Sequence, residues 1–198
     1  MRFCDTIIFM EEFEIKFLEV NVPKLEKKLL EIGVQKVFSF LYRRRVFDFP
    51  DLRLAGDHSW LRVRDEGDRI TFTYKKRLGV GEDKLKDGGM HEVEIVVDNF
   101  EKTAELLRSI GMVEKFYEEN KRTKYVFEDV EFCIDEWPLI PPYLEIEGKS
   151  WETVKGAVSK LGLNWEGHVK CSTMQVYRHY GINENDFSFL TFEKQVKK

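Results

Sequence analysis

The stretch EEFEIKF, residues 11–17, alternates charged and apolar side chains along its length. A period of two residues is that of a β-strand, in which neighbouring side chains point to opposite faces. One face would carry Phe13, Ile15 and Phe17, and the other would carry Glu12, Glu14 and Lys16. A surface strand with its charges in water shows the same pattern, so the rest of the chain has to decide what this strand does.

The same two-faced pattern recurs in later segments of the chain. Their polar faces carry Arg62 and Arg64; Thr71, Thr73 and Lys75; Glu92 and Glu94; Arg122 and Lys124; Glu131, Cys133 and Asp135; and Glu145 and Glu147. Amphipathic helices are also predicted, and they need an apolar surface to cover. If the helices pack outside the sheet, the charged faces line its interior, which must then hold water, ions or a ligand.

A unit of strand, cap, helix and glycine occurs more than once. The first unit runs from residue 11 to Gly33 with Asn21 as the cap, and the second runs from residue 91 to Gly111 with Asn99 as the cap. A shorter third copy covers residues 143–162, with Ser150 as the cap. The spacing is too long for a solenoid, so the pattern indicates an internal duplication.

These features predict the α+β class, with an antiparallel sheet that closes into a barrel and helices packed outside. No linker rich in proline or serine divides the units, so they are expected to share one domain at residues 11–180. Residues 1–10 are expected to be an N-terminal extension, and residues 181–198 a C-terminal tail with a short helix.

Composition excludes several classes of protein. Of the 198 residues, 34% are charged but the net charge is only −4, which argues against a nucleic-acid-binding protein. Three cysteines without CxxC spacing argue against a disulfide framework and a thiolate zinc site, and favour a cytoplasmic location. The first residues do not show the pattern of a signal peptide or a membrane span.

The charged faces indicate what the interior would bind. Guanidinium and ammonium groups bind phosphate oxygens through charge-assisted hydrogen bonds, and carboxylates bind hard divalent cations. A polyphosphate together with Mg²⁺ or Mn²⁺ would satisfy both sets of side chains, and this pairing is usual in phosphoryl-transfer chemistry.

The segment EFEIKF resembles the ExExK signature of the CYTH family, the triphosphate tunnel metalloenzymes. The resemblance continues in order through LRVR, TYK, EVEIVVDN, KRTKY, CIDEWP and YLEIEG, and reaches Lys170. It implies an eight-stranded antiparallel closed barrel, built from two pseudo-symmetric halves around a charged triphosphate tunnel, over residues 11–180.

The resemblance also implies roles for individual residues. The triphosphate would be held by Lys16, Arg62, Arg64, Lys75, Arg122, Lys124 and Lys170. Mg²⁺ or Mn²⁺ would be bound by Glu12, Glu14, Asp135, Glu145 and Glu147, and catalysis would depend on Lys16, Lys75 and Arg122. Glu92 and Glu94 would orient basic side chains. Asn120 stands where many family members have lysine, and Lys124 on the same face is expected to compensate.

Two reactions would use this apparatus. The sequence favours hydrolysis of an organic or inorganic triphosphate, such as thiamine triphosphate or tripolyphosphate, because no base-recognition pocket is evident. A class IV adenylyl cyclase, which converts ATP to cyclic AMP and pyrophosphate, is the first alternative, and a non-catalytic module that binds nucleotides or polyphosphate is the second. The expected partner is a small-molecule triphosphate, with no nucleic acid and no membrane, bound by a monomer or homodimer.

Overall fold

The structure is a computed structural model that describes residues 13–78 and 90–198. The first half contains β1 (Phe13–Phe17), α1 (Val22–Glu31), β2 (Gln35–Asp48), α2 (Arg53–Gly56), β3 (Ser59–Asp65) and β4 (Ile70–Arg77). The second contains β5 (Met90–Val97), α3 (Phe100–Ser109), β6 (Val113–Phe127), β7 (Val130–Glu136) and β8 (Tyr143–Gly148). The remaining elements are α4 (Trp151–Lys160), α5 (Thr173–His179), β9 (Phe187–Leu190) and β10 (Gln195–Lys197).

The strand order shows the duplication directly. The sheet runs β1-β8-β7-β6-β2-β3-β4-β5, and every neighbouring pair on this path is antiparallel. The long strands β2 and β6 pair with each other at the centre, and each is followed outward by the two strands that come after it in the chain. Each edge strand therefore lies beside strands of the other half: β1 pairs with β8, and β5 pairs with β4.

The helix starts are fixed by the predicted caps. The Asn21 side chain accepts a hydrogen bond from the Lys24 backbone N–H at 3.0 Å, and the Asn99 side chain does the same for Lys102 at 2.9 Å. Ser150 caps α4 in the same way. Such caps satisfy backbone donors that have no partner within the helix.

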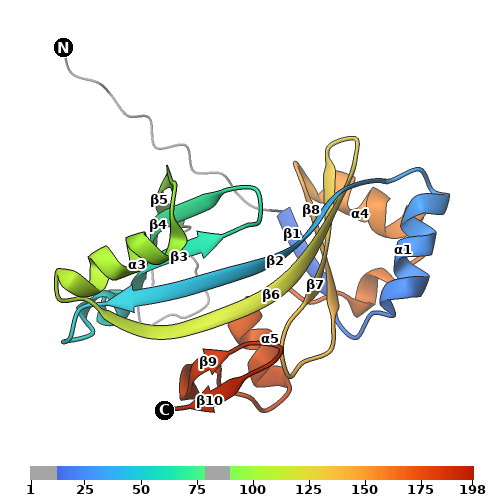
Figure 1. The fold of residues 1–198 in the computed structure, drawn as a ribbon. Coiled ribbons are helices and arrows are strands. Elements are labelled where there is room, and N and C mark those ends of the chain that lie inside the picture. The colour runs from blue at the N-terminus through green and yellow to red at the C-terminus, as the bar shows by residue number, and fades with distance from the viewer. Residues whose placement is uncertain (1–12, 79–89) are drawn as a thin grey trace.

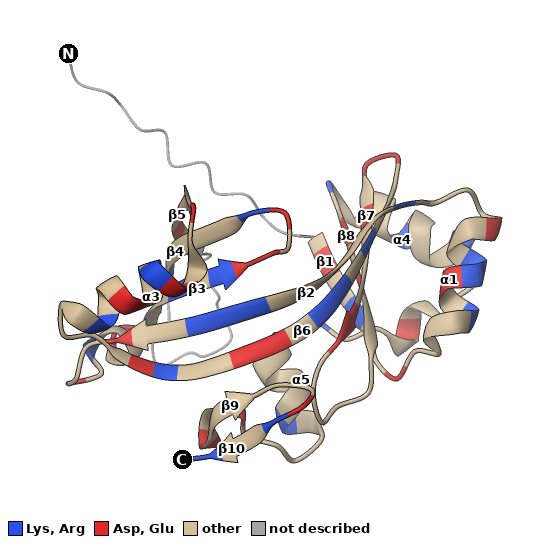
Figure 2. Cartoon of the chain, viewed as in Figure 1, with Lys and Arg blue, Asp and Glu red and all other residues tan. Residues whose placement is uncertain are grey.

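The helices cover much of the outer, apolar face of the sheet, as predicted (Figure 1), but Val93 and Ile95 on the apolar face of β5 stay exposed. Leu29 of α1 and Val158 of α4 share a buried cluster with Ile15, Ile134 and Ile146 of strands β1, β7 and β8. A second cluster joins α3 to β2 and β3. Because side chains alternate along a strand, this packing turns the charged faces of these strands toward the interior. Figure 2 shows where the basic and acidic residues lie along the strands.

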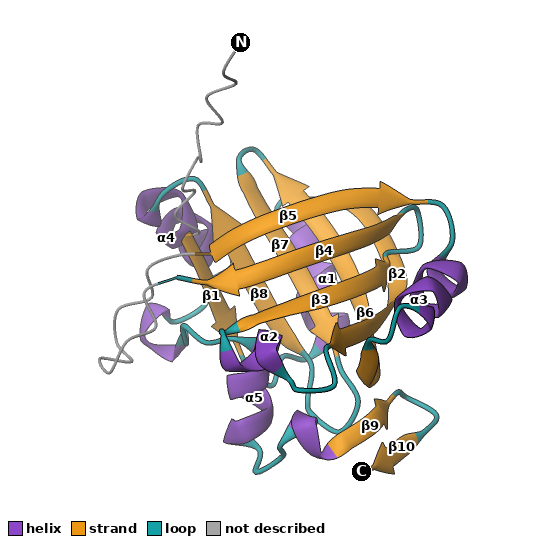
Figure 3. Ribbon diagram, turned by 90° about the vertical axis from the view of Figure 1, so that its left-hand side faces the viewer, coloured by secondary structure: helices purple, strands orange, loops and turns teal. Residues whose placement is uncertain are grey.

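The sheet curls strongly, so that β3, β4 and β5 lie across the interior from β7 and β8 (Figure 3). The predicted closure of a barrel is not confirmed. All five described residues of β1 pair with β8 and all described pairs of β5 are with β4, so the hydrogen-bonded path of the described strands ends at these two strands. The α+β class and the antiparallel sheet are confirmed.

The C-terminal segment differs from the expected short helix. After α5, a 3₁₀ turn at Glu184–Asp186 leads into a hairpin of β9 and β10. Strand β9 lies parallel to β6 where Phe189 pairs with Tyr117. None of the helices in the described part of the chain is long and apolar enough to cross a membrane.

Candidate functional site

A network of ion pairs joins β1, β6, β7 and β8 on the interior face. The register places Lys16 opposite Glu145 and Arg122 opposite Asp135. Lys16 Nζ lies 3.2 Å from Glu145 Oε2 and also pairs with Glu14. Arg122 donates to Asp135 from Nε and Nη2 at 2.8 and 2.5 Å, and its Nη2 also reaches Glu145 Oε1 at 3.1 Å. Strand pairing therefore brings four residues predicted from different segments into one network.

The network fixes the charge of its members. Burial opposes the charge on Lys16, but the carboxylates of Glu145 and Glu14 outweigh it and raise the Lys16 pKa above its ordinary value. Burial likewise opposes the charge on Arg122, but its carboxylate partners raise the Arg122 pKa well above the usual range. Burial would raise the Glu145 pKa, yet Arg122 and Lys16 lower it. Lys16 and Arg122 therefore stay positively charged at neutral pH.

The facing wall, made of β3, β4 and β5, carries three more of the predicted cations, Arg62, Arg64 and Lys75. Lys75 Nζ lies 2.7 Å from Glu92, as expected for a carboxylate that orients a basic side chain. Arg64 Nε donates to Glu66 at 2.6 Å. Arg62 is different, because its nearest carboxylate, on Glu94, lies 4.0 Å away.

Arg62 has buried donors without partners. Its Nε and Nη2 are shielded from solvent, and no hydrogen-bond acceptor reaches them in the described residues. Burial, together with the nearby guanidinium groups of Arg64 and Arg44, lowers the Arg62 pKa to about 9. A buried donor without a partner costs free energy, so this wall is suited to an anion that would accept these hydrogen bonds.

Arg44 of β2 is a site residue that the sequence reasoning missed. It lies between Glu118 of β6 and Arg64 of β3 in the strand register. Its Nη2 donates to Asn120 Oδ1, and Asn120 Nδ2 donates to Asp135 Oδ1 at 3.1 Å. The cation that the structure brings to Asn120 is therefore Arg44. The β2 segment lacks the apolar–polar alternation that marked the interior faces of the other strands, so the sequence gave no signal for Arg44.

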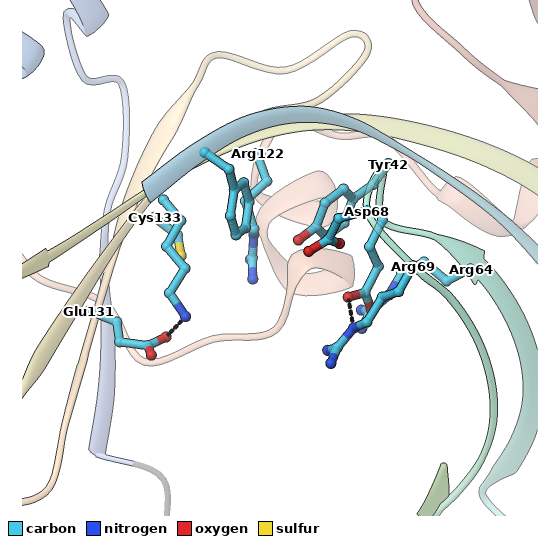
Figure 4. A pocket seen from close by; sticks show the side chains of 10 residues that line it. Tyr42, Arg64, Asp68, Arg69, Arg122, Glu131 and Cys133 are labelled. Carbon is cyan, nitrogen blue, oxygen red and sulfur yellow. Dashed lines mark hydrogen bonds and ion pairs between the residues drawn. The ribbon is translucent and has the colours of Figure 1, made fainter. Parts of the chain in front are cut away.

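A pocket of about 340 Å³ opens between the β3–β4 turn and strands β2, β6 and β7 (Figure 4). Its walls are formed by Phe38, Tyr42, Arg64, Glu66, Asp68, Arg69, Arg122, Lys124, Glu131 and Cys133. Lys124 Nζ lies 2.6 Å from Glu131 on one side, and Arg69 Nε donates to Glu66 at 2.8 Å on the other. Three of the predicted triphosphate-binding residues thus line one pocket.

Cys133 behaves as a small interior residue. Only 6% of it is exposed, and burial is the main reason that the pKa of its thiol is raised to about 12. A thiol with such a pKa is protonated at neutral pH and is a poor nucleophile. It forms part of the pocket wall.

The other predicted residues are placed as follows. Glu147 faces Glu14 in the β1–β8 register, and Glu12 lies outside the described residues. Lys170 is exposed, and its Nζ lies 3.6 Å from the ring centroid of Trp151, which packs edge-on against Phe13 on the apolar side of β1. Lys170 is therefore not brought together with the interior cations.

The carboxylates do not form a ready-made metal cage. Across residues 13–78 and 90–198, no group of three or more His, Cys, Asp or Glu side chains is arranged to hold a metal ion. Asp135 and Glu145 are instead paired with Arg122 and Lys16. The carboxylates nevertheless suit Mg²⁺ or Mn²⁺, because these ions prefer oxygen ligands.

Comparisons with known proteins agree with this architecture. The model of the CYTH domain matches residues 10–173. PH1012 protein from Pyrococcus horikoshii OT3 is 21% identical, with a TM-score of 0.61 over 84% of this chain and 99% of its own. A "putative adenylate cyclase" from Vibrio parahaemolyticus is 12% identical, with a TM-score of 0.66; the match covers 84% of this chain and 97% of the Vibrio chain. HpAC1 from Hippeastrum is 19% identical, with a TM-score of 0.58; the match covers 89% of this chain and 99% of HpAC1. No curated protein matches the chain.

Proposed function

The chain belongs to the CYTH domain family, and on this premise we propose that it is a divalent-metal-dependent enzyme that hydrolyses a triphosphate in its charged interior. Thiamine triphosphate and tripolyphosphate are the proposed substrates. The observation that carries the proposal is the buried guanidinium of Arg62, whose Nε and Nη2 have no acceptor in the part of the chain that the structure describes. Phosphate oxygens are the acceptors that match a guanidinium best.

Cations on both walls would hold the phosphate chain. Arg62, Arg64 and Lys75 lie on one wall, and Lys16, Arg122 and Lys124 lie on the other. Fixed positive charges in a water-poor interior stabilise the charge that develops when a phosphoryl group is transferred. Lys16, Lys75 and Arg122 are proposed to neutralise the leaving group. Lys170 has no part in this proposal, because it lies over Trp151.

The acidic residues are proposed to hold the metal. Glu14, Asp135, Glu145 and Glu147, with Glu12, would bind Mg²⁺ or Mn²⁺, which neutralises phosphate oxygens and positions or activates a water molecule. Without a ligand, Lys16 pairs with Glu145 and Arg122 pairs with Asp135. When a triphosphate binds, the two cations would pair with phosphate oxygens and the two carboxylates would pair with the metal. The proposal includes closure of the interior into a tunnel between the edge strands β1 and β5.

Adenylyl cyclase activity is the second candidate. The pocket beside Arg64 and Arg122 gives an organic group room next to the phosphate-binding cations, and a cyclase needs that space. Hydrolysis remains the first choice. HpAC1, which has a similar fold, is named as a putative adenylyl cyclase and described as having a dominant triphosphatase activity.

Removing the charge of two carboxylates tests the metal-enzyme proposal. Glu145→Gln with Glu147→Gln keeps the side-chain shapes, and we expect roughly a 100-fold loss of phosphate release together with a higher Mg²⁺ requirement. The exposed Glu105→Gln on α3 serves as the matched control. Phosphate release equal to that of wild type in the double variant would rule out these two residues as metal ligands.

A further inference from the structure

The C-terminal segment, residues 173–198, begins where the match to the CYTH domain ends. It comprises α5, the 3₁₀ turn and the β9–β10 hairpin, and it lies below the ends of the sheet strands in Figure 3. Strand β9 pairs with β6 at Tyr117 and Glu118, beyond the last residue of β6 that pairs with β7. A buried apolar cluster joins Trp137, Ile140 and Tyr143 on the sheet side to Val176, Phe187 and Leu190 of the segment. The segment is therefore docked on the sheet through a continuous interface.

Two carboxyl groups are buried at this interface. Glu118 lies on the interior face of β6, two residues before Asn120, and is 6% exposed, whereas Glu184 lies in the 3₁₀ turn and is 9% exposed. Neither carboxylate forms a hydrogen bond or an ion pair with another residue in the described part of the chain. Ionised carboxylates are almost never buried so deeply without a partner, because the charge loses its hydration. The burial of both groups therefore favours a protonated carboxyl at this interface.

Arg44 of β2 faces Glu118 but is bonded elsewhere. The strand register places the two residues directly opposite each other. The Arg44 Nη2 donates instead to Asn120, and the guanidinium carbon lies 4.4 Å from the ring centroid of Trp137. Its Nε is shielded from solvent and meets no acceptor among the residues that the structure describes. An ionised Glu118 would attract this free donor, so the observed arrangement is the one expected when Glu118 is neutral.

The surroundings favour a proton shared by the two carboxyl groups. Burial, followed by the nearby Glu118, raises the pKa of Glu184 to about 8, although Arg44 and Arg178 oppose the shift. Burial also raises the pKa of Glu118, against Arg44 and Arg62. The pair therefore titrates together and keeps at least one proton at neutral pH. The other charged or titratable groups that face the pair are Arg44 on β2, Arg62 on β3, and Tyr177 and Arg178 on α5.

We propose that Glu118 and Glu184 make the docking of the C-terminal segment depend on pH. While the pair holds a proton, the segment stays on β6 and Arg44 donates to Asn120. When alkaline solution removes the proton, two like charges face each other in the interface, Glu118 attracts Arg44, and the C-terminal segment loosens from the sheet. The proton passes to solvent, and no covalent bond of the protein breaks. This inference does not depend on the reaction proposed above, because neither carboxyl group is among the proposed metal or phosphate ligands.

The first test measures stability against pH in Glu184→Gln, whose amide resembles the neutral acid. The pKa of Glu184 in the folded chain is raised above its ordinary value of 4.5, so the folded chain holds a proton that the unfolded chain releases. Wild type therefore loses stability as the pH rises from about 5 to about 8, and this loss ends above the folded-state pKa. The melting temperature of Glu184→Gln minus that of wild type should rise by several degrees over the same range and then stay level. Glu193→Gln, exposed in the β9–β10 turn, is the control and should give a constant difference.

The second test measures whether the C-terminal segment loosens. Hydrogen exchange followed by mass spectrometry, corrected for the intrinsic effect of pH on exchange, gives the protection of peptides from residues 181–198 at about pH 6.5 and about pH 9. Protection of these peptides should fall about tenfold in wild type between the two pH values and should stay the same in Glu184→Gln. Peptides from α4 report on the rest of the fold and should keep their protection at both pH values.

Either measurement can overturn the inference. A melting-temperature difference that is the same at every pH would show that the pKa of Glu184 is not raised in the folded chain. A difference that rises while the protection of residues 181–198 stays unchanged would show that the proton does not control the segment, and an equal loss of protection in α4 would show unfolding of the whole chain. Glu118→Gln removes the charge on the other side of the pair and should reproduce both expected results, so the test also holds if Glu184→Gln folds poorly.

Discussion

Arg122→Met is expected to abolish most activity and to destabilise the fold. Asp135 is fully buried and would lose both hydrogen bonds from Arg122, and an unpaired buried charge costs about 3–5 kcal/mol. Loss of a fixed cation at the reacting phosphate should lower kcat by roughly 10²–10³. Urea denaturation measures the free energy of unfolding, and initial rates of phosphate release measure kcat.

A second substitution separates the two effects of Arg122→Met. Adding Asp135→Asn removes the buried charge, and the amide can still accept the hydrogen bond from Asn120. The double variant should regain most of the lost stability but none of the activity. Recovery of neither stability nor activity would contradict the claim that the Asp135 charge is what Arg122 compensates.

Arg62→Met should have the opposite effect on stability. The buried Nε and Nη2 of Arg62 have no partner in the described structure, and neighbouring guanidinium groups disfavour its charge. An apolar side chain of similar length removes this cost and should stabilise the fold by about 1–2 kcal/mol. The same change should weaken binding of tripolyphosphate roughly 100-fold, because a phosphate would lose a buried charged partner.

Thermal unfolding with and without tripolyphosphate measures both effects of Arg62→Met together. Without ligand, the variant should melt a few degrees higher than wild type. Tripolyphosphate should raise the melting temperature of the variant less than it raises that of wild type. Arg53→Met is the control, because this arginine is exposed and lies against Phe49 outside the interior. A variant that melts lower than wild type and binds equally well would show that Arg62 has a structural role.

Much of the fold could be predicted because local signals agreed with the global pattern. Asn21, Asn99 and Ser150 begin helices where the sequence places caps. Helices α1 and α4 cover the apolar faces of β1, β7 and β8. The pairing of β9 with β6 could not be predicted, because two short strands far from β6 in sequence carry little periodicity. Closure of the sheet also depends on how strongly it curls, which no local pattern specifies.

Part of the site was missed because β2 is not two-faced in sequence. Phe38 and Tyr42 point to the interior, yet Val37 and Leu41 on the opposite face are also apolar and stay exposed. Without alternation, the strand gave no signal of which face holds Arg44, Phe38 and Tyr42. The strands with clear alternation placed Lys16, Arg62, Arg122 and Glu145 correctly on the interior.

The most direct test of the central claim is product analysis with purified protein. Tripolyphosphate, thiamine triphosphate and ATP are each incubated with Mg²⁺, with Mn²⁺ or with EDTA, and orthophosphate, pyrophosphate and cyclic AMP are quantified together. A metal-dependent triphosphatase predicts orthophosphate that is lost in EDTA, without cyclic AMP. Cyclic AMP with an equal amount of pyrophosphate would establish the cyclase instead, and absence of all three products while the triphosphates still bind would contradict an enzymatic function.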